Sequence, residues 1–455
     1  MNVPLYGVLS DGSLFFDFSD FISFLLSIWW FFTVLLIVPF GMKFWLVWRR
    51  YLWEKNEGYT FIEIIPPKNV PQPFQAMEHV YEQISTIHTS LTGMRDIPKR
   101  WWHGKQQAFF TVEIVATGGR IRFLIRCSKK HTDTIKVALQ SQFANLGIAE
   151  DVPDYLKLVS WATPNAEWDL YGLDFSLSRP DVYPIKTYTS FEPRPDIVEE
   201  KRIDPLSTLL AGLATMGDDE YLFFQMRCAP VTGKETDFYQ RSKKVISKLA
   251  FRRSEKPARG EREVVPSEMK LTGRERDVVA EIQRKASKSL FHTNIRLLYM
   301  ARRSLFRENR IGLAEQFLAT FSAQDLNSFR KFRKTRTKVY YYHILYQRFL
   351  YVKKRQFLRR YILREVPLYP MAGSTYILNT EELATLFHIP LALATTGIPV
   401  ETIASKVGAP PLNLLTKRGD LLDEDNDTPS ARLADQPRLT GASGREEGDN
   451  NTHTQ

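Results

Sequence analysis

The stretch "FFTVEIVATGGRIRFLIRC" (Phe109–Cys127) decides the fold of this chain, because it has the pattern of a β-hairpin. Two apolar runs, "FFTVEIVA" and "IRFLIRC", flank Thr117-Gly118-Gly119-Arg120. The two central glycines supply the positive φ angles that a type I′ turn requires. The sequence therefore predicts two neighbouring antiparallel strands at this point.

Helical patterns precede and follow this hairpin. We expect a helix from Phe74 to about His88, after the stiff spacer "PPKNVPQP". After Cys127 the apolar period becomes helical, with Thr132 as the expected N-cap and Gly147 as the expected stop. The apolar residues of this second helix are Ile135, Ala138, Leu139, Phe143 and Leu146. The unit reads helix, strand, strand, helix.

Similar units follow downstream. Asp204-Pro205 is a good start for the helix "PLSTLLAGLATM", which leads to the strand "EYLFFQMRC" and a run with Val245, Ile246 and Leu249 on one face. A capping box, Thr272 with Glu275, precedes the strand "HTNIRLLYMA". The helix expected after that strand carries Ile311, Ala314, Leu318 and Phe321. This order predicts an α+β fold of antiparallel sheets covered by helices, arranged as two duplicated ferredoxin-like units.

The only two cysteines of the chain both follow an arginine at the end of an apolar run, as Arg126-Cys127 and Arg227-Cys228. They are either a metal or redox pair or small residues in a recurring strand-to-helix unit. Their flanks are apolar, no thiol or histidine is near in sequence, and a zinc site usually needs four ligands at short spacing. We therefore expect structural cysteines, no metal and no cofactor.

The N-terminal region predicts a transmembrane helix over 21–48. From Phe21 to Met42 the chain has 22 residues without a charge, enough to cross the roughly 30 Å hydrocarbon core of a bilayer. A cleaved signal peptide is the alternative, but acidic residues, not basic ones, precede this run. Lys43, Arg49, Arg50 and Lys55 follow it, so the positive-inside rule leaves the N-terminus outside and the bulk in the cytoplasm. The aromatic belt expected at the inner headgroups is Trp45, Trp48, Tyr51 and Trp53.

A second distinctive stretch, Arg330 to Arg364, holds thirteen Lys and Arg, nine aromatic residues and no Asp or Glu. Such a segment can rest on an anionic leaflet or an acidic partner, bind single-stranded nucleic acid, or form a helix that simply displays its charges to water. We favour contact with the membrane. The residues expected to make it are Arg330, Lys331, Arg333, Lys334, Arg336, Lys338, Lys353, Lys354, Arg355, Arg359 and Arg360.

Composition completes the predicted organisation. The segment 252–267 is charged and poor in apolar residues, and the tail from 413 lacks aromatic residues, so both are expected to be disordered. The predicted ranges are an extracytoplasmic N-terminus (1–20), the transmembrane helix (21–48), two α+β units (57–200 and 201–328), the basic helical segment (329–365), a small helical region (366–412) and the tail (413–455).

Catalytic signatures are missing from the sequence. Gly104-Lys105 and Gly233-Lys234 do not complete a phosphate-binding P-loop, and HExxH, GxSxG, EF-hand and CxxC patterns are absent. The eight histidines are scattered. We expect a protein without enzymatic activity, and an enzyme whose residues converge only in three dimensions is a distant alternative.

Several segments resemble the N-terminal region of uncharacterised bacterial membrane proteins of the candidate-phyla type. These are "HVYEQISTIHTSL", the hairpin with the helix after it, "NIRLLYMARRS", "LNSFRKF", "ILNTEELATLFHIP" and "KVGAPPLNLL", between about Tyr59 and Leu415. In "LNTEELATLFHIP", Asn379 and Glu382 have the spacing of a capping box.

In those proteins the region often precedes a HerA-like or type IV secretion coupling ATPase domain, which we expect to be missing here. The resemblance implies a membrane-anchored scaffold that docks with a motor ATPase of a DNA- or protein-translocation machine. A nucleic-acid-binding membrane protein is the alternative.

Overall fold

The computed structural model describes most of the chain between residues 29 and 390. The described ranges are 29–67, 73–89, 94–143, 145–158, 163–190, 204–251, 271–340, 345–365 and 372–390, with residues 22–23, 27 and 91 in addition. The segments predicted at 1–20, 252–267 and 413–455 lie outside them, as do 366–371 and 391–412 of the predicted small helical region.

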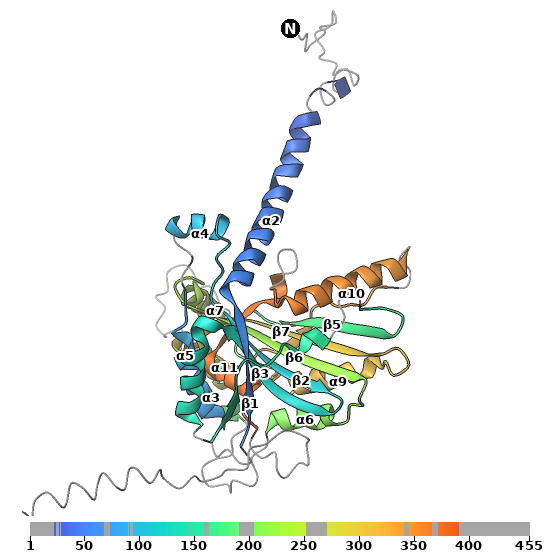
Figure 1. Ribbon diagram of the computed structural model, residues 1–455. Coiled ribbons are helices and arrows are strands. Elements are labelled where there is room, and N and C mark those ends of the chain that lie inside the picture. Colours follow the sequence, from blue (N-terminus) through green and yellow to red (C-terminus); the bar gives the residue numbers. More distant parts are fainter. Residues whose placement is uncertain are drawn as a thin grey trace, which may run out of the picture. The chain divides into compact units, whose positions relative to one another are not determined.

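One nine-stranded sheet forms the centre of the structure (Figure 1). Its strands are β1 (Tyr59–Ile65), β2 (Phe110–Thr117), β3 (Arg120–Ser128), β4 (Gly147–Ala149), β5 (Trp168–Leu177), β6 (Glu220–Val231), β7 (Leu290–Arg302), β8 (Phe329–Lys331) and β9 (Tyr376–Asn379). The spatial order is β4-β1-β3-β2-β6-β7-β5-β8, with β9 paired to β7. Every described strand pair is antiparallel.

The predicted hairpin is confirmed as β2 and β3. Thr117 pairs with Arg120, and Gly118 and Gly119 between them have φ angles of +57° and +75°. Alternation along β2 sends Val112, Ile114 and Ala116 into the main hydrophobic core, while Thr111 and Glu113 face the opposite side of the sheet.

The sheet has two halves of the same connectivity. In the first, the order is β1, α3 (Pro73–Ser85), β2, β3, α5 (Thr132–Gln142), β4. In the second it is β5, α6 (Pro205–Ala214), β6, β7, α9 (Gly312–Ala319), β8. Counted within its own half, each has the spatial order 4-1-3-2, and the second strands, β2 and β6, pair where the halves meet. The predicted α+β class with antiparallel pairing is therefore confirmed.

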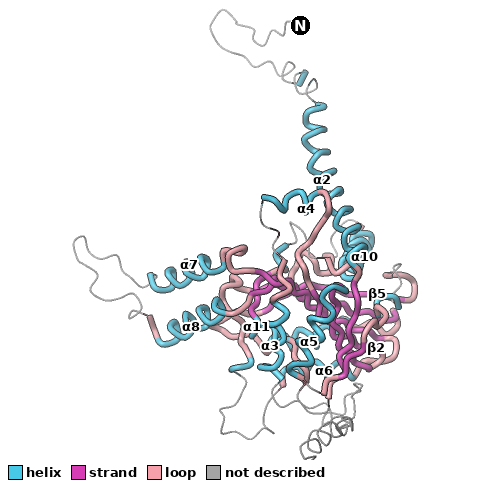
Figure 2. Tube along the Cα trace, turned by 60° about the vertical axis from the view of Figure 1, so that its left-hand side comes forward, coloured by secondary structure: helices cyan, strands magenta, loops and turns pink. Residues whose placement is uncertain are grey.

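The remaining elements attach to this frame. They are α2 (Trp29–Glu57), α4 (Ile97–Trp101), α7 (Phe238–Phe251), α8 (Gly273–Ser287), α10 (Tyr346–Ile362) and α11 (Thr380–Leu386). Helices α3, α5, α6, α9 and α11 contribute to the main core on one face of the sheet. Figure 2 shows α3, α5 and α11 together. Helices α7 and α8, which follow β6 and precede β7 in the chain, pack side by side. Helix α10 covers part of the other face, where Phe357, Leu358 and Tyr361 join a second core.

Several details differ from the sequence predictions. Helix α5 starts at Thr132, so the residue before it occupies the cap position, and the helix ends at Gln142, five residues before Gly147. Gly147 instead begins the edge strand β4. Strand β5 falls within the range predicted for the first unit but pairs with β7 and β8 of the second half. The predicted basic helix is continuous only in α10, because residues 329–331 form β8.

The two Arg-Cys pairs do not mark equivalent positions of a repeated unit. Cys127 lies in β3, the third strand of its half, whereas Cys228 lies in β6, the second strand of the other half. Both arginines pair with Thr111 of β2, so they flank the same strand from its two sides. Both cysteines are free and buried, and burial raises the pKa of each thiol, that of Cys127 to about 11.

Candidate functional site

Helix α2 displays apolar side chains to solvent along its first half. Trp30, Phe31, Val34, Ile37, Val38, Phe40 and Phe44 are all exposed. Figure 1 shows this part of α2 extending away from the sheet. Among the residues that the structure describes, no helix has both the length and the apolar character needed to cross a membrane.

An aromatic cluster surrounds the middle of α2. The indole Nε1 of Trp45 donates a hydrogen bond to the carbonyl oxygen of Trp101 in α4, at 3.1 Å. The Trp45 ring also makes edge contacts with Trp48 at 5.5 Å and Trp102 at 6.1 Å between ring centroids. An apolar groove of about 660 Å³ lies between the two helices. We call Trp45, Trp48, Trp101 and Trp102 the tryptophan collar.

The aromatic belt predicted from the sequence overlaps the tryptophan collar only in part. Trp45 and Trp48 belong to the tryptophan collar, Tyr51 is exposed one turn further on, and Trp53 is half-buried. Trp101 and Trp102 were not predicted as part of a site, because nothing in the sequence "KRWWHGK" indicates that α4 packs against α2. The close approach depends on Gly104, because a Cβ there would lie 2.3 Å from the carbonyl oxygen of Arg49.

The predicted basic residues fall into three groups. Lys331, Lys338 and Lys354 form ion pairs with Glu315 (2.6 Å), Glu308 (3.9 Å) and Asp169 (2.6 Å). Two bond to hydroxyls: Arg336 donates to Tyr171 and Arg330 donates to Ser176 at 3.3 Å. The others, exposed or half-buried, are Arg333, Lys334, Lys353, Arg355, Arg359 and Arg360. Lys354, only 8% exposed, faces the sheet and is therefore not available to a membrane or a nucleic acid.

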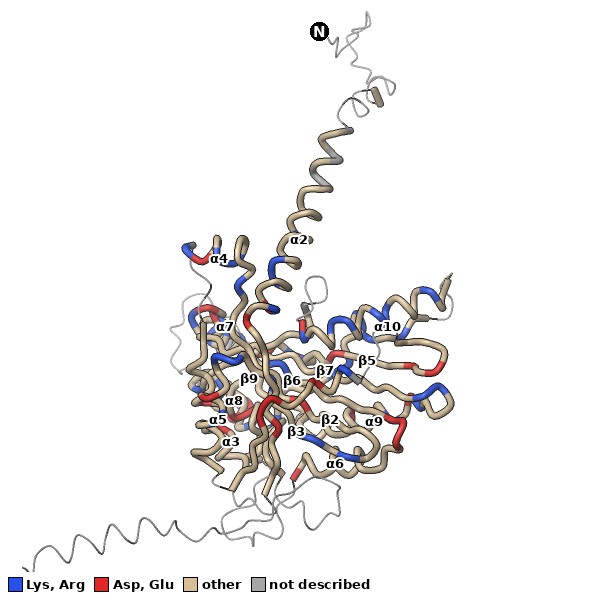
Figure 3. The backbone as a smooth tube through the Cα atoms, viewed as in Figure 1, with Lys and Arg blue, Asp and Glu red and all other residues tan. Residues whose placement is uncertain are grey.

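Helix α10 is amphipathic, with its polar face carrying aromatic residues as well. Phe357, Leu358 and Tyr361 point into the protein, while Phe349 and Tyr351 are exposed. Figure 3 shows the lysines and arginines of α10, of α4 and of the C-terminal part of α2 on the side of the sheet from which α2 extends. The basic positions of α10 thus lie on the same side of the sheet as α2 and α4, the helices next to the tryptophan collar.

A buried ion network fixes the end of α10 to the sheet. Arg364 donates to Glu113 of β2 at 2.8 and 3.2 Å and to Asp154 at 3.0 and 3.2 Å. Glu113 also accepts hydrogen bonds from Thr111 at 2.6 Å and Gln225 at 2.9 Å. Arg364 adopts a left-handed φ of +52°, which turns the chain after α10. The C-terminal end of α10 is therefore held at a defined position on the sheet.

The family model that matches this chain is the domain of unknown function DUF8128, over residues 52–397. The chain belongs to the DUF8128 family. Among curated proteins, a search finds no match. The DUF8128 match takes in the whole sheet and helices α3 to α11, and it begins within α2, after the exposed apolar part.

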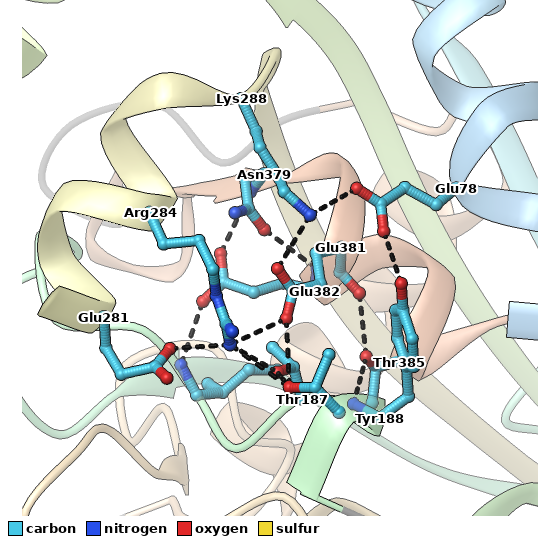
Figure 4. Close-up of polar contacts among 12 residues, drawn as sticks. Glu78, Thr187, Tyr188, Glu281, Arg284, Lys288, Asn379, Glu381, Glu382 and Thr385 are labelled. Atoms are coloured by element: carbon cyan, nitrogen blue, oxygen red, sulfur yellow. Dashed lines mark hydrogen bonds and ion pairs between the residues drawn. The ribbon is translucent and has the colours of Figure 1, made fainter. Parts of the chain in front are cut away.

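A second polar cluster within the DUF8128 match joins α3, α8 and α11 (Figure 4). Lys288, the residue that follows α8, forms ion pairs with Glu78 of α3 at 2.5 Å and with Glu381 at 2.8 Å. Lys285 forms an ion pair with Glu382 at 2.9 Å. Asn379 caps α11, with Glu382 completing the predicted capping box, which is confirmed.

This cluster is structural in character. Glu381 and Glu382 are 1% and 0% exposed, so a substrate cannot reach them. Glu382 also accepts the backbone N–H of Ile185 at 2.9 Å, and Thr385 accepts that of Tyr188 at 3.0 Å, so α11 also fixes the 185–188 segment. The resembling segment "LNTEELATLFHIP" is thus the part of the DUF8128 domain that holds three helices and a loop together.

In the described ranges of the DUF8128 domain, no group of three or more His, Cys, Asp or Glu side chains is placed to hold a metal ion. His388 is buried and lies 2.9 Å from Asp204, which caps α6. This pair connects the end of α11 to the start of α6.

Proposed function

We propose that the protein is a membrane-anchored, non-enzymatic scaffold whose DUF8128 domain lies at the inner membrane surface. The observation that carries this proposal is the exposed apolar first half of α2, which joins the charge-free sequence run from Phe21 to Met42. Apolar area of this extent on a helix outside the protein core is stabilised by transfer into lipid. The N-terminus lies outside and the sheet in the cytoplasm, as the basic residues after the run require.

The tryptophan collar and the surface of α10 fit the headgroup region. Indole rings favour the boundary between lipid and water, where one side is apolar and the N–H finds a polar partner. Exposed rings and cations of α10, on the same side of the sheet, suit an anionic leaflet.

The partner class in this proposal comes from the resemblance alone, and it is a motor ATPase of a translocation machine. We also propose that the two halves are ferredoxin-like units related by duplication, a view that their common strand order of 4-1-3-2 supports. Such a sheet is a platform for docking and has no need of catalytic residues.

Replacing Val34 and Ile37 together by aspartate should move the protein from the membrane to the soluble fraction of cells. Each side chain is at least half exposed on α2, and aspartate costs roughly 2.5–3.5 kcal/mol in the middle of a membrane helix. Val137→Asp is the matched control, since Val137 is similarly exposed but lies on α5, outside the exposed apolar part of α2. Unchanged sedimentation of the double variant with membranes would contradict the anchor.

Reversing the charges of Lys353, Arg355 and Arg359 should weaken binding of the full chain to anionic vesicles by about 1 kcal/mol per charge. Lys354 is left unchanged because it pairs with Asp169 inside the protein. Single-stranded DNA is titrated against the same variants at two salt concentrations. Nucleic-acid binding, which the exposed Phe349 and Tyr351 also suit, predicts tight DNA binding that falls steeply with salt and no preference for anionic lipid. That result would replace the membrane assignment of α10.

A further inference from the structure

A cavity of about 320 Å³ lies where α2, α4 and the ends of β6 and β7 meet. Four cations line it, Arg50 from α2, Arg100 from α4, Lys105 from the following loop and Arg227 from β6. Glu235 is the single carboxylate among the described lining residues, and it is already bound to His88 at 2.8 Å.

These four cations have no directly bound carboxylate among the described residues, although the charges of Glu365 and Glu54 act on Arg50 and Arg227 from further away. In the described part of the chain, none of their side chains forms an ion pair or a hydrogen bond. Burial, with the charge of Arg100, lowers the pKa of Arg50 below its ordinary value. Like charges that line one cavity repel one another, so an anion that entered the cavity would relieve a cost that the fold already bears.

Arg227 is the strongest indication that the cavity accepts an anion. Its side chain is 8% exposed, its guanidinium lies 3.9 Å from the centroid of the Phe109 ring, and its buried Nε has no hydrogen-bond partner in the described structure. Burial, together with the charge of Arg296, lowers its pKa to about 10. Leaving such a buried donor unsatisfied costs about 1–3 kcal/mol.

Arg126 provides the internal comparison. It flanks β2 from the other side, pairs with the same Thr111, and stacks on Tyr59 at 3.8 Å much as Arg227 stacks on Phe109. Arg126, however, has a carboxylate partner, Glu54 at 3.2 Å. Each of the two arginines keeps one buried nitrogen without a hydrogen-bond partner in the described structure, but only Arg126 forms an ion pair there.

We propose that this cavity binds the phosphate group of a small anionic ligand. Guanidinium groups bind phosphate oxygens through paired hydrogen bonds, and several cations approaching from different elements suit its tetrahedral oxygens. The imidazole of His292 also lines the cavity with a buried Nδ1 that has no partner in the described structure. The volume is at the lower end of the range for small-molecule sites, which suits a phosphorylated headgroup or metabolite.

Two sources can supply such a phosphate. The cavity adjoins α2 below the tryptophan collar through Arg50 and Arg100, so an anionic phospholipid headgroup is one of them, and this source rests on the proposed membrane anchor. A soluble phosphorylated metabolite is the other and does not depend on the anchor.

The test is calorimetric titration of the full chain with glycerol phosphate, first in mild detergent and then in phosphatidylcholine nanodiscs. We expect saturable binding that Arg100→Gln with Lys105→Gln weakens about tenfold or more. Arg120→Gln, at the exposed start of β3 and outside the cavity, should leave it unchanged. The double variant alters half-buried or exposed side chains and should fold; Arg227→Gln is the variant with the largest expected loss. Absence of binding in detergent, or equal affinity of the double variant, would overturn the site.

Nanodiscs containing phosphatidylglycerol separate the two sources. If the lipid headgroup occupies the cavity, glycerol phosphate should bind the protein in phosphatidylglycerol nanodiscs at least several-fold more weakly than in phosphatidylcholine nanodiscs. Equal affinity in both discs would support the site and assign its ligand to the soluble phase. A chain that binds glycerol phosphate in detergent but does not enter nanodiscs would contradict the membrane anchor while supporting the phosphate site.

Discussion

Replacing Arg364 by methionine is expected to lower the free energy of unfolding by about 3–5 kcal/mol, the usual cost of removing one partner from a buried ion pair. The side chains of Arg364 and Glu113 are 2% and 0% exposed, so the Glu113 carboxylate would stay buried without its cation. Denaturant unfolding followed by circular dichroism measures the change. Arg359→Met is the matched control, because Arg359 lies on the exposed side of α10, and a change within about 0.5 kcal/mol is expected there.

A double-mutant cycle distinguishes the loss of the ion pair from the loss of packing. Glu113→Gln added to Arg364→Met removes the stranded charge and keeps a side chain that bonds to Thr111 and Gln225. The double variant should therefore be more stable than Arg364→Met alone. If the double variant is the less stable of the two, the cost lies in the contact of Arg364 with the Phe61 ring, 4.9 Å away, and not in the ion pair.

The same pair predicts a pH dependence. Burial raises the pKa of Glu113, but the charge of Arg364 and the hydrogen bonds from Arg364 and Thr111 outweigh it, and the pKa lies below its ordinary value. Glu113 therefore binds its proton more weakly in the folded than in the unfolded protein. The stability that the pair contributes is present above the unfolded pKa of about 4.3 and is lost as the pH falls through the lower folded value. Glu113→Gln should remove this part of the acid sensitivity.

Local patterns were sufficient to predict the elements that local chemistry determines. The Gly118-Gly119 turn, the Asp204 cap of α6 and the capping boxes of α8 and α11 are confirmed, because each depends on residues within four positions of one another. The short strand β4 was missed because Gly147, the first of its three residues, was interpreted as the stop signal of the preceding helix. The two Arg-Cys pairs suggested a repeated unit, and this prediction was wrong. Both arginines owe their positions to pairing with β2, which the sequence pattern does not reveal.

The candidate sites depend on contacts between distant segments, which a single sequence does not reveal. Arg50, Arg100 and Arg227 meet in one cavity although 177 positions separate the first from the last. The basic stretch was visible from its composition, but its division into paired and exposed cations was not. Asp169 and Glu315, which neutralise Lys354 and Lys331, lie outside that stretch and reach it only through the sheet.

Replacing Phe357 by alanine is expected to destabilise the protein by about 3–5 kcal/mol, because it leaves a cavity where α10 packs against the sheet. Phe357 is 2% exposed and belongs to the second core with Tyr361 and Leu298. The ring lies directly over Gly172 of β5, where a Cβ would come within 2.1 Å of its Cδ1. Gly172→Ala should therefore cost about 1–3 kcal/mol by itself, since the ring has to move.

Coupling between the two positions tests whether α10 is seated as described. In Gly172→Ala with Phe357→Ala, the added methyl enters space that the ring has left, so the double variant should lose less than the sum of the single losses, by about 1 kcal/mol or more. Gly312→Ala is the control, because no heavy atom lies within 4 Å of a Cβ at that position. Strictly additive losses would mean that the ring does not rest on Gly172. Since Phe357 holds the helix whose other face carries Arg355 and Arg359, Phe357→Ala should also weaken binding to anionic vesicles without removing a single charge.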